Sequence, residues 1–407
     1  MTPLLQIEEP QAAPQPAPEW KAFMAMGFRP LYLAGCLWAA LSVALWVYAP
    51  QWLTGQLGGV LWHAHEMLWA FVATIAVGFL LTAAGNWTGR NPLAGKPLTA
   101  LCALWCLARI AFFLPGVAAL LLGAVAELLF FAGAAVALGR VIYATRSGRN
   151  YGLPLLLLGL AVADGLYLWA AWQGDYGLLM QRFYAGLLCM AIIALLIARR
   201  VVPFFAMRAV AGLDIPMLGG SVPWQLGASG LALVCLLLGW QPGLALGLAV
   251  AGLLTLWQLL AWKPWAVRKV PLLWVLYVGH AGLALGLLVA AAQAMGWVLR
   301  LAWPVHVMGV LGFAVLIMGM VTRTALGHLG RPLRSDASMV TAYGLVIAAA
   351  VLRLLALWPT ALSLAALHAS ALAWVLGFGL YLWRFAPWLL RPRADQAGQG
   401  AIPIRRR

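Results

Sequence analysis

The sequence contains little charge. Of its 407 residues, 9% are Asp, Glu, Lys or Arg, only ten are acidic, and 65% are hydrophobic. A soluble domain covers its surface with charged and polar side chains, and a mean hydropathy of +0.94 leaves too few of them to do so. No segment between the apolar runs is long enough to hold a soluble domain. These absences exclude a water-soluble fold and indicate an integral membrane protein.

The sequence lacks the cysteine motif of covalent haem proteins. The chain has no C-x-x-C-H motif, which excludes covalent attachment of haem through thioether bonds. No cleavable signal peptide is evident, because the first apolar run starts late and is long enough to span a membrane. The five cysteines all fall within apolar runs, where we expect core packing: Cys36, Cys102, Cys106, Cys189 and Cys235.

The apolar runs predict an all-α polytopic fold. A helix that crosses a bilayer needs about 20 predominantly apolar residues. We therefore expect about 12 transmembrane helices, and the runs cover roughly 28–48, 60–84, 97–115, 117–143, 153–173, 177–203, 221–239, 243–262, 271–295, 299–322, 338–357 and 360–386. Residues 21–390 should form a single twelve-helix membrane domain. We expect residues 1–20, rich in Pro, Gln and Ala, to be a disordered cytoplasmic tail, and 391–407 a basic cytoplasmic tail.

Basic residues alternate between the two sides of the expected bundle. All but four of the 26 Lys and Arg residues fall at every second loop or in the C-terminal segment, whereas the alternate loops carry none. This is the positive-inside pattern, which predicts that both termini are cytoplasmic. The net charge of +16 then faces anionic lipid of the inner leaflet, and no nucleic-acid partner is needed to explain it.

Five of the six histidines fall in one layer toward the outer side, and the sixth, His328, falls at the cytoplasmic rim. Ionisable side chains inside hydrocarbon are costly and mark functional sites. Several imidazoles with almost no cysteine or carboxylate beside them predict a haem or copper site. The five are His63, His65, His280, His306 and His368.

Two of these histidines are only two residues apart. On a regular helix His63 and His65 point about 200° apart, so one metal cannot easily take both. They face two different cofactors, or one binds metal while the other bonds to Glu66 or to a neighbouring helix. For His368 an interhelical hydrogen bond is as good an explanation as ligation.

A second set of ionisable residues lies at unusual depth. The four basic residues that violate the inside bias are Arg109, Arg182, Arg300 and Arg353. Haem propionates would balance them, and Arg109 and Arg353 are the deepest and have no obvious protein anion; the alternative is snorkelling to lipid phosphate. Glu127 and Asp164 fall near mid-membrane, where each relays protons, binds a cation, or makes an interhelical hydrogen bond in its protonated form.

Two expected cytoplasmic corners are similar in sequence. Thr82 is followed by Gly89-Arg90-Asn91-Pro92-Leu93, and Thr322 is followed by Gly330-Arg331-Pro332-Leu333. An outer histidine precedes each corner at a similar distance. The similarity is either a weak internal repeat or shared turn chemistry, and we favour turn chemistry.

Several sequence blocks together resemble the NnrS family of haem- and copper-containing bacterial membrane proteins. The resemblance covers nearly the whole chain, and the second and last blocks are the most specific. The blocks are Phe28-Arg29-Pro30, Trp62-His63-Ala64-His65-Glu66-Met67, Gly78-Phe79-Leu80-Leu81-Thr82-Ala83, Asn86-Trp87-Thr88-Gly89, Arg199-Arg200-Val201-Val202-Pro203-Phe204-Phe205, Met320-Val321-Thr322-Arg323 and Leu326-Gly327-His328-Leu329-Gly330-Arg331-Pro332.

The resemblance implies twelve helices, bound haem b and copper, and a part in the nitric oxide response. With it, the histidine layer predicts a site that binds nitric oxide and reduces it to nitrous oxide, in nitrosative-stress defence or denitrification. Such an oxidoreductase, of the nitric oxide reductase type, would lie in the bacterial inner membrane with its cofactors toward the periplasm. Its electrons would come from quinol or from a periplasmic cytochrome or cupredoxin.

Each ionisable residue then has an expected role. We expect the metal ligands among His63, His65, His280, His306 and His368, and Arg109 and Arg353 as partners of the haem propionates. Glu66 and Glu127 are the expected catalytic residues, which move protons toward bound nitric oxide.

Two other classes of protein remain as alternatives. One is a non-catalytic haem protein that senses nitric oxide or protects metal centres from it, which sustained consumption with an electron donor would exclude. The other is a twelve-helix secondary transporter. Transporters often contain repeated halves, and the sequence has no convincing six-helix repeat.

Overall fold

The computed structural model describes residues 16–395, and within this range the chain is helical and has no strands. Twelve of its helices are long and apolar enough to cross a membrane, which confirms the predicted polytopic all-α fold. The expected tails fall largely on residues 1–15 and 396–407, outside the described residues. Which end of the bundle faces the cytoplasm stays a prediction from the charge pattern.

Each predicted span has a counterpart in the structure. In chain order they are α2 (Phe28–Tyr48), a continuous span of α3 (Gly59–His65), η2 (Glu66–Ala73) and α4 (Thr74–Thr88), α5 (Gly95–Phe113), α6 (Val117–Ala144), α7 (Gly152–Gln173), α8 (Tyr176–Ala209), α9 (Val222–Leu237), α10 (Gln241–Ala261), α11 (Pro271–Ala294), a continuous span of α12 (Ala302–His306), η6 (Val307–Ala314) and α13 (Val315–His328), α14 (Ala337–Ala356) and α15 (Ser363–Leu389). The short elements are α1 (Trp20–Phe23) and the 3-10 turns η1 (Pro50–Trp52), η3 (Gly148–Asn150), η4 (Gly219–Ser221) and η5 (Pro264–Val267).

Three predicted helix ends fall short of the observed ones. The spans expected to end near 84, 203 and 322 continue to Thr88, Ala209 and His328. Apolar runs stop where polar residues begin, but a helix continues beyond the hydrocarbon because its backbone hydrogen bonds do not depend on side-chain polarity. Boundaries read from apolar runs therefore mark the membrane-embedded part of a helix.

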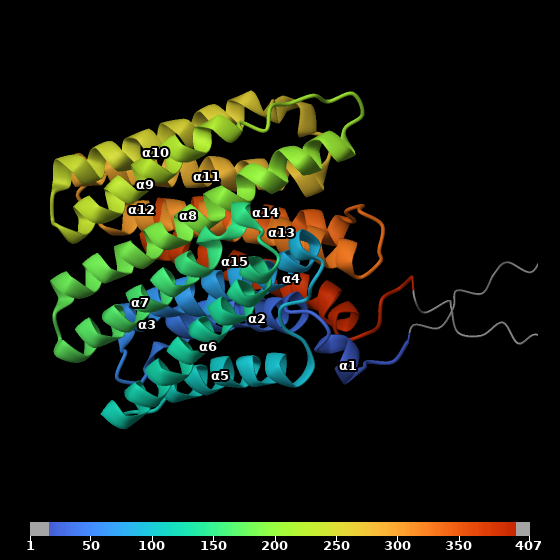
Figure 1. Ribbon diagram of the computed structural model, residues 1–407. Helices are drawn as coiled ribbons and strands as arrows, with labels where there is room; N and C mark the ends of the chain where they lie inside the picture. The colour runs from blue at the N-terminus through green and yellow to red at the C-terminus, as the bar shows by residue number, and fades with distance from the viewer. Residues whose placement is uncertain (1–15, 396–407) are drawn as a thin grey trace, which may run out of the picture.

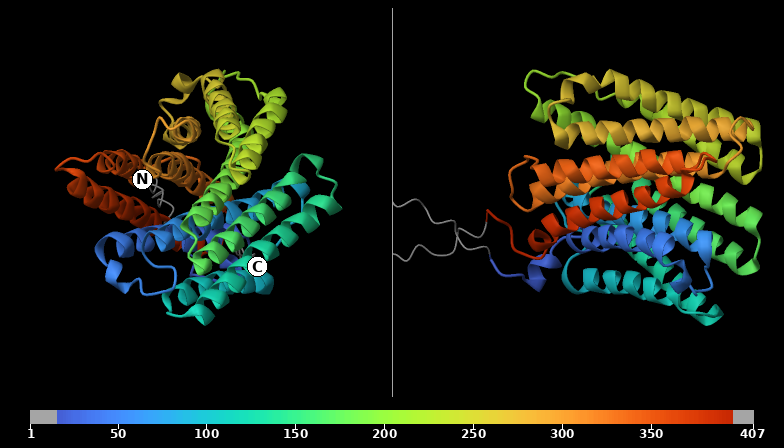
Figure 2. Two further views of the ribbon diagram at one scale, coloured as in Figure 1. Left: turned by 90° about the vertical axis from the view of Figure 1, so that its left-hand side faces the viewer. Right: turned by 180° about the vertical axis from the view of Figure 1, so that it is seen from behind.

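The helices run side by side along one common direction (Figures 1 and 2). Sequential hairpins pack together, and the first and last spans, α2 and α15, also lie against each other. The backbone N–H of Glu19 donates to the carbonyl of Leu390 at 2.8 Å. The described ends of the chain thus meet at one end of the bundle, as an even number of spans requires.

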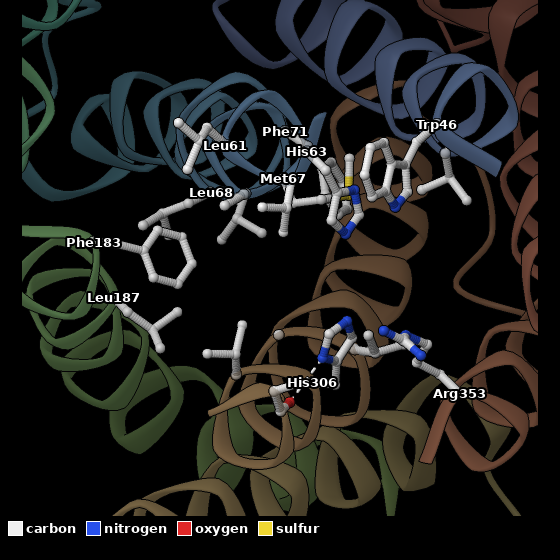
Figure 3. A pocket seen from close by; sticks show the side chains of 18 of the residues that line it. Trp46, Leu61, His63, Met67, Leu68, Phe71, Phe183, Leu187, His306 and Arg353 are labelled. Atoms are coloured by element: carbon white, nitrogen blue, oxygen red, sulfur yellow. Dashed lines mark hydrogen bonds between the residues drawn. The ribbon is translucent and has the colours of Figure 1, made fainter. Parts of the chain in front are cut away.

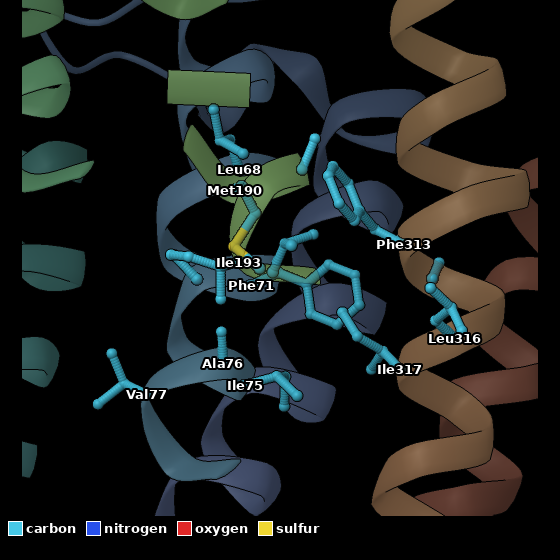
Figure 4. Close-up of a cluster of buried hydrophobic side chains, with 14 of the residues drawn as sticks. Leu68, Phe71, Ile75, Ala76, Val77, Met190, Ile193, Phe313, Leu316 and Ile317 are labelled. Carbon is cyan, nitrogen blue, oxygen red and sulfur yellow. The ribbon is translucent and has the colours of Figure 1, made fainter. Parts of the chain in front are cut away.

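The second span forms the centre of the bundle. In its most apolar window, 94% of the residues are buried. Figure 4 shows Leu68, Phe71 and Ile75 of this span packed with Met190 of α8 and Phe313 of η6. Two sides of the second span, bearing His63 and His65, therefore both face protein instead of lipid.

Two spans contain long π-helical segments. Residues Glu66–Ala73 and Val307–Ala314 are π-helical, each segment begins directly after a histidine, and the two segments contact each other. π-helical turns are rare, are usually single, and occur frequently at functional sites. The second and tenth spans thus share an α–π–α pattern in addition to similar corners. This similarity goes beyond the turn chemistry that we favoured from the sequence.

Glycines allow α11 to approach the second of these π-helical segments closely. A Cβ atom on Gly282 would lie 2.5 Å from the carbonyl carbon and oxygen of Leu311, which are backbone atoms and cannot rotate away. We predict that Gly282→Ala lowers the free energy of unfolding by about 1–3 kcal/mol through overpacking. Thermal unfolding in detergent measures the effect. The control is Gly379→Ala, whose Cβ meets nothing within 4 Å. An equal melting temperature for the two variants would contradict the prediction.

Candidate functional site

A cavity of about 280 Å³ lies among the spans, in the half of the bundle away from the described chain ends. Its walls come from α2, α3, η2, α7, α8, α12, η6, α14 and α15. Most of the lining is apolar or aromatic, and no carboxylate lines it. Such a pocket, with a few polar groups in apolar walls, is typical of a cofactor or ligand site.

His63 and His306 lie in opposite walls of this cavity, with an open space between their rings (Figure 3). The ring of His63 stacks on Trp46, with the centroids 5.4 Å apart and an interplanar angle of 11°. Its Nδ1 atom is buried and has no hydrogen-bond partner. Arg353, half-buried in α14, lies beside His306 in the same wall (Figure 3). The structure thus joins two of the predicted metal ligands with one predicted propionate partner.

The orientation of His306 is set by its own helix. Its Nδ1 lies 2.7 Å from the carbonyl oxygen of Ala302, one turn earlier. Because that oxygen can only accept, Nδ1 carries the proton and Nε2 keeps its lone pair. This is the arrangement usual for a metal-binding imidazole, whose second nitrogen donates to a carbonyl or carboxylate. The unpartnered Nδ1 of His63 and the oriented ring of His306 would suit these residues to hold haem iron or copper.

His65 points away from the cavity, into a buried ionic cluster. Its Nδ1 lies 2.9 Å from Glu66, and its Nε2 lies 3.0 Å from Asp164 and 3.3 Å from Glu127. All of these side chains are at most 1% exposed. His63 and His65 face different surroundings, as helical periodicity predicts, and His65 bonds to Glu66. Metal binding by either histidine stays a prediction.

Arg109 corrects one premise of the sequence analysis. We expected it to have no protein anion nearby, and this was wrong: its guanidinium donates to Glu66 at 2.6 Å and also to Glu127. The hairpin of α5 and α6 brings Arg109 and Glu127 together, and such helix adjacency is not visible in a sequence. Arg109 is only 3% exposed and does not line the cavity. Its expected role as a haem propionate partner therefore loses its basis.

Two other histidines lie outside the cavity. His280 of α11 is fully buried against Trp262, with ring centroids 5.0 Å apart, and neither ring nitrogen has a partner. Close approaches of Gly279 to Leu316 and of Gly286 to Met308 set the antiparallel register, which places His280 about 12 Å deeper than His306.

His368 is exposed on α15 and stacks on Tyr48. Its neighbours Leu367, Ser370 and Ala371 line the cavity instead. The structure therefore gathers two of the five candidate ligands in the cavity and separates the other three. His328, at the far end of the tenth span, packs on Phe28 away from both sites, as expected.

Sequence reasoning missed three residues at these sites and left the role of a fourth open. Trp46 and Met67 line the cavity beside His63, and Tyr167 both lines the cavity and stacks on His65 at 5.8 Å. For Asp164 the sequence left three roles open: proton relay, cation binding and an interhelical hydrogen bond. Tyr167 follows Asp164 by three residues on one helix face, a spacing that could have associated them.

Comparison with known proteins gives a family. A family model described as "NnrS protein" matches residues 22–393. No curated protein and no solved structure matches the chain. Since the matched segment covers nearly the whole chain, this multi-pass membrane protein belongs to the NnrS family, which implies a part in the nitric oxide response.

Proposed function

We propose that the cavity between His63 and His306 binds haem b and copper, and that nitric oxide binds there. The observation that carries the proposal is the pair of half-buried imidazoles facing each other across an apolar cavity, one with its tautomer set by a carbonyl. Imidazole nitrogen suits both iron and copper. The thioether of Met67, in the same wall as His63, adds a soft donor that suits copper(I).

The walls provide what a non-covalent haem needs. Aromatic rings of Phe71, Phe183 and Trp374 give a large apolar contact surface for a porphyrin. Arg353, half-buried at the cavity, supplies a guanidinium that pairs with a propionate carboxylate. Apolar walls disfavour water and suit nitric oxide, which is small and uncharged.

The proposed reaction is the reduction of two molecules of nitric oxide to nitrous oxide and water, with two electrons and two protons. When bound, haem iron would take nitric oxide and copper would offer a second Lewis-acidic centre. Electrons would come from quinol or a periplasmic cytochrome or cupredoxin. The charge pattern supports the proposal that the site lies toward the periplasm of a bacterial inner membrane. Glu66 and Glu127 remain the proposed proton carriers. Both contact His65, whose ring stacks on Tyr167, and Tyr167 lines the cavity.

A second function, non-catalytic binding of nitric oxide for sensing or protection, is favoured by one observation. Among residues 16–395, no hydrogen bond joins the ionic cluster to a side chain that lines the cavity, and the lining contains no carboxylate. A reductase needs a route for protons, whereas a sensor does not. The transporter alternative predicts two similar six-helix halves, in which the second span would correspond to the eighth. The shared α–π–α pattern relates the second span to the tenth instead.

The decisive experiment uses the purified full-length protein in detergent. We expect a Soret band, copper by elemental analysis, and a spectral shift on addition of nitric oxide to the reduced protein. Sustained consumption with a competent electron donor, and formation of nitrous oxide, would support the reductase. A spectral shift without turnover would support the non-catalytic protein, and absence of both haem and copper would refute the proposal.

Arg353 provides a more specific prediction. We expect Arg353→Ala to weaken haem retention several-fold, because a propionate in this apolar wall would lose its counter-charge. Haem loss to apomyoglobin, followed by absorbance, measures the retention. The matched control is Arg182→Ala, another outer-side arginine that does not line the cavity. Equal rates of haem loss in the two variants would remove Arg353 from the site.

A further inference from the structure

The ionic cluster beside the cavity has the composition of a separate metal site. We propose that His65, Glu127 and Asp164 bind one divalent first-row cation, such as Zn²⁺ or Fe²⁺, at a site distinct from the cavity. The three residues come from α3, α6 and α7, so the cation would link three spans in the membrane interior. The proposal does not depend on the function proposed for the cavity.

The geometry suits a coordination sphere. One ligand atom from each residue lies within 4.8 Å of the other two, and Nε2 of His65 is 3.0 Å from Asp164 and 3.3 Å from Glu127. Ligands that sit about 2.0–2.2 Å from a zinc ion are about 3–3.5 Å from one another. The carboxylate oxygens therefore need only small rotations to enclose a cation.

Two oxygen atoms in the cluster have no partner. Oε1 of Glu127 and Oδ2 of Asp164 are buried without a hydrogen bond among the described residues, and the side chains are 1% and 0% exposed. A buried carboxylate oxygen normally accepts at least one hydrogen bond, because leaving it unpaired forfeits its hydration. A cation between the two carboxylates would supply the missing interaction.

The charges in the cluster also require a cation. Glu66, Glu127 and Asp164 carry three negative charges when ionised, and Arg109 supplies one positive charge. With His65 neutral, two negative charges are unbalanced in an interior from which water is excluded. One divalent cation makes the whole cluster neutral, whereas protonation of His65 alone leaves one negative charge.

The surrounding side chains orient the ligands. Glu66 accepts from Nδ1 of His65, which turns the lone pair of Nε2 toward Glu127 and Asp164. Such carboxylate–histidine–metal arrangements are common in metalloproteins. Arg109 holds both glutamates, and the indole N–H of Trp38 also donates to Glu66. In this arrangement Glu127 is a ligand, which leaves Glu66 as the proposed proton carrier.

The donor set separates this site from the copper proposed for the cavity. One imidazole and two carboxylates form a borderline-to-hard set without thiolate or thioether, which suits Zn²⁺, Fe²⁺ or Mn²⁺ better than copper(I). Zn²⁺ is a convenient probe because it has no redox chemistry of its own.

The test loads the full-length protein with Zn²⁺, removes weakly bound metal by dialysis against a chelator, and counts the zinc retained per chain. We expect one equivalent in the wild type, at least a tenfold lower occupancy in Asp164→Asn, and full occupancy in Asp175→Asn. Asp175 is an exposed helix cap, whose role Asn can keep. The Soret band should be the same in all three proteins, which separates this site from the cavity.

A measurement on the wild type guards against misfolding of the variant. Zinc K-edge absorption should give a first shell of nitrogen and oxygen only, with the outer-shell signature of one imidazole. Retention of zinc by both Asp164→Asn and Glu127→Gln would overturn the site, as would sulfur in the first shell. Absence of retained zinc in the wild type would mean that protons balance the cluster, and would overturn it too.

Discussion

His306→Ala should remove the Soret band of the purified protein almost completely. His306 is the one imidazole in the cavity whose tautomer is set by its own helix, through the 2.7 Å contact of Nδ1 with Ala302. Its free Nε2 lone pair is what haem iron requires. Alanine at this position leaves the apolar walls intact but removes the ligand that, as we propose, holds a haem without thioether links. We expect His63→Ala to lower haem or copper content as well, since His63 occupies the opposite wall.

Two controls separate ligation from folding. His368→Ala removes an exposed imidazole outside the cavity and should keep the full spectrum. In His306→Gly, added imidazole should restore part of the Soret band by occupying the vacated position. If His63→Ala and His306→Ala both keep haem and copper at the wild-type level, the cavity is not the cofactor site.

Arg109→Leu should lower the free energy of unfolding by about 3–5 kcal/mol, the largest stability effect that we expect from one substitution. Arg109 is 3% exposed and donates to both Glu66 and Glu127. Its removal leaves two carboxylates without their counter-charge in an interior that water does not reach. Lysine should rescue little, because a single ammonium cannot reproduce the two-sided contact of a guanidinium. Thermal unfolding in detergent and the yield of monodisperse protein measure the effect.

A double variant tests the electrostatic cause. Arg109→Leu combined with Glu127→Gln removes one charge of each sign, so it should be less destabilised than the sum of the two single variants. Residues in one ion-pair network typically couple by about 0.5–3 kcal/mol. Arg182→Ala, outside the cluster, should stay near the wild-type melting temperature. Additive effects of the two cluster substitutions would show that Arg109 stabilises the fold by packing alone.

The sequence by itself determined the properties that depend on short stretches of chain. Apolar runs located all twelve spans, because a bilayer requires each crossing segment to be apolar along its own length. Helical periodicity separated His63 from His65, because the direction of a side chain follows from its position along the helix. The family motifs are likewise contiguous in the chain, and the family match covers residues 22–393.

Only the tertiary structure decided which helices touch. It placed His306 opposite His63, and it paired Arg109 with Glu127, where the sequence analysis had assumed no protein anion. It also brought Asp164 into contact with His65, and it contains two π-helical segments that no local sequence pattern predicted. The physical reason is that all apolar helices are similarly soluble in lipid. The hydropathy of a helix therefore does not indicate which other helices pack against it. Adjacency comes from close packing at small residues and from a few buried polar contacts, which exist only once the bundle has assembled.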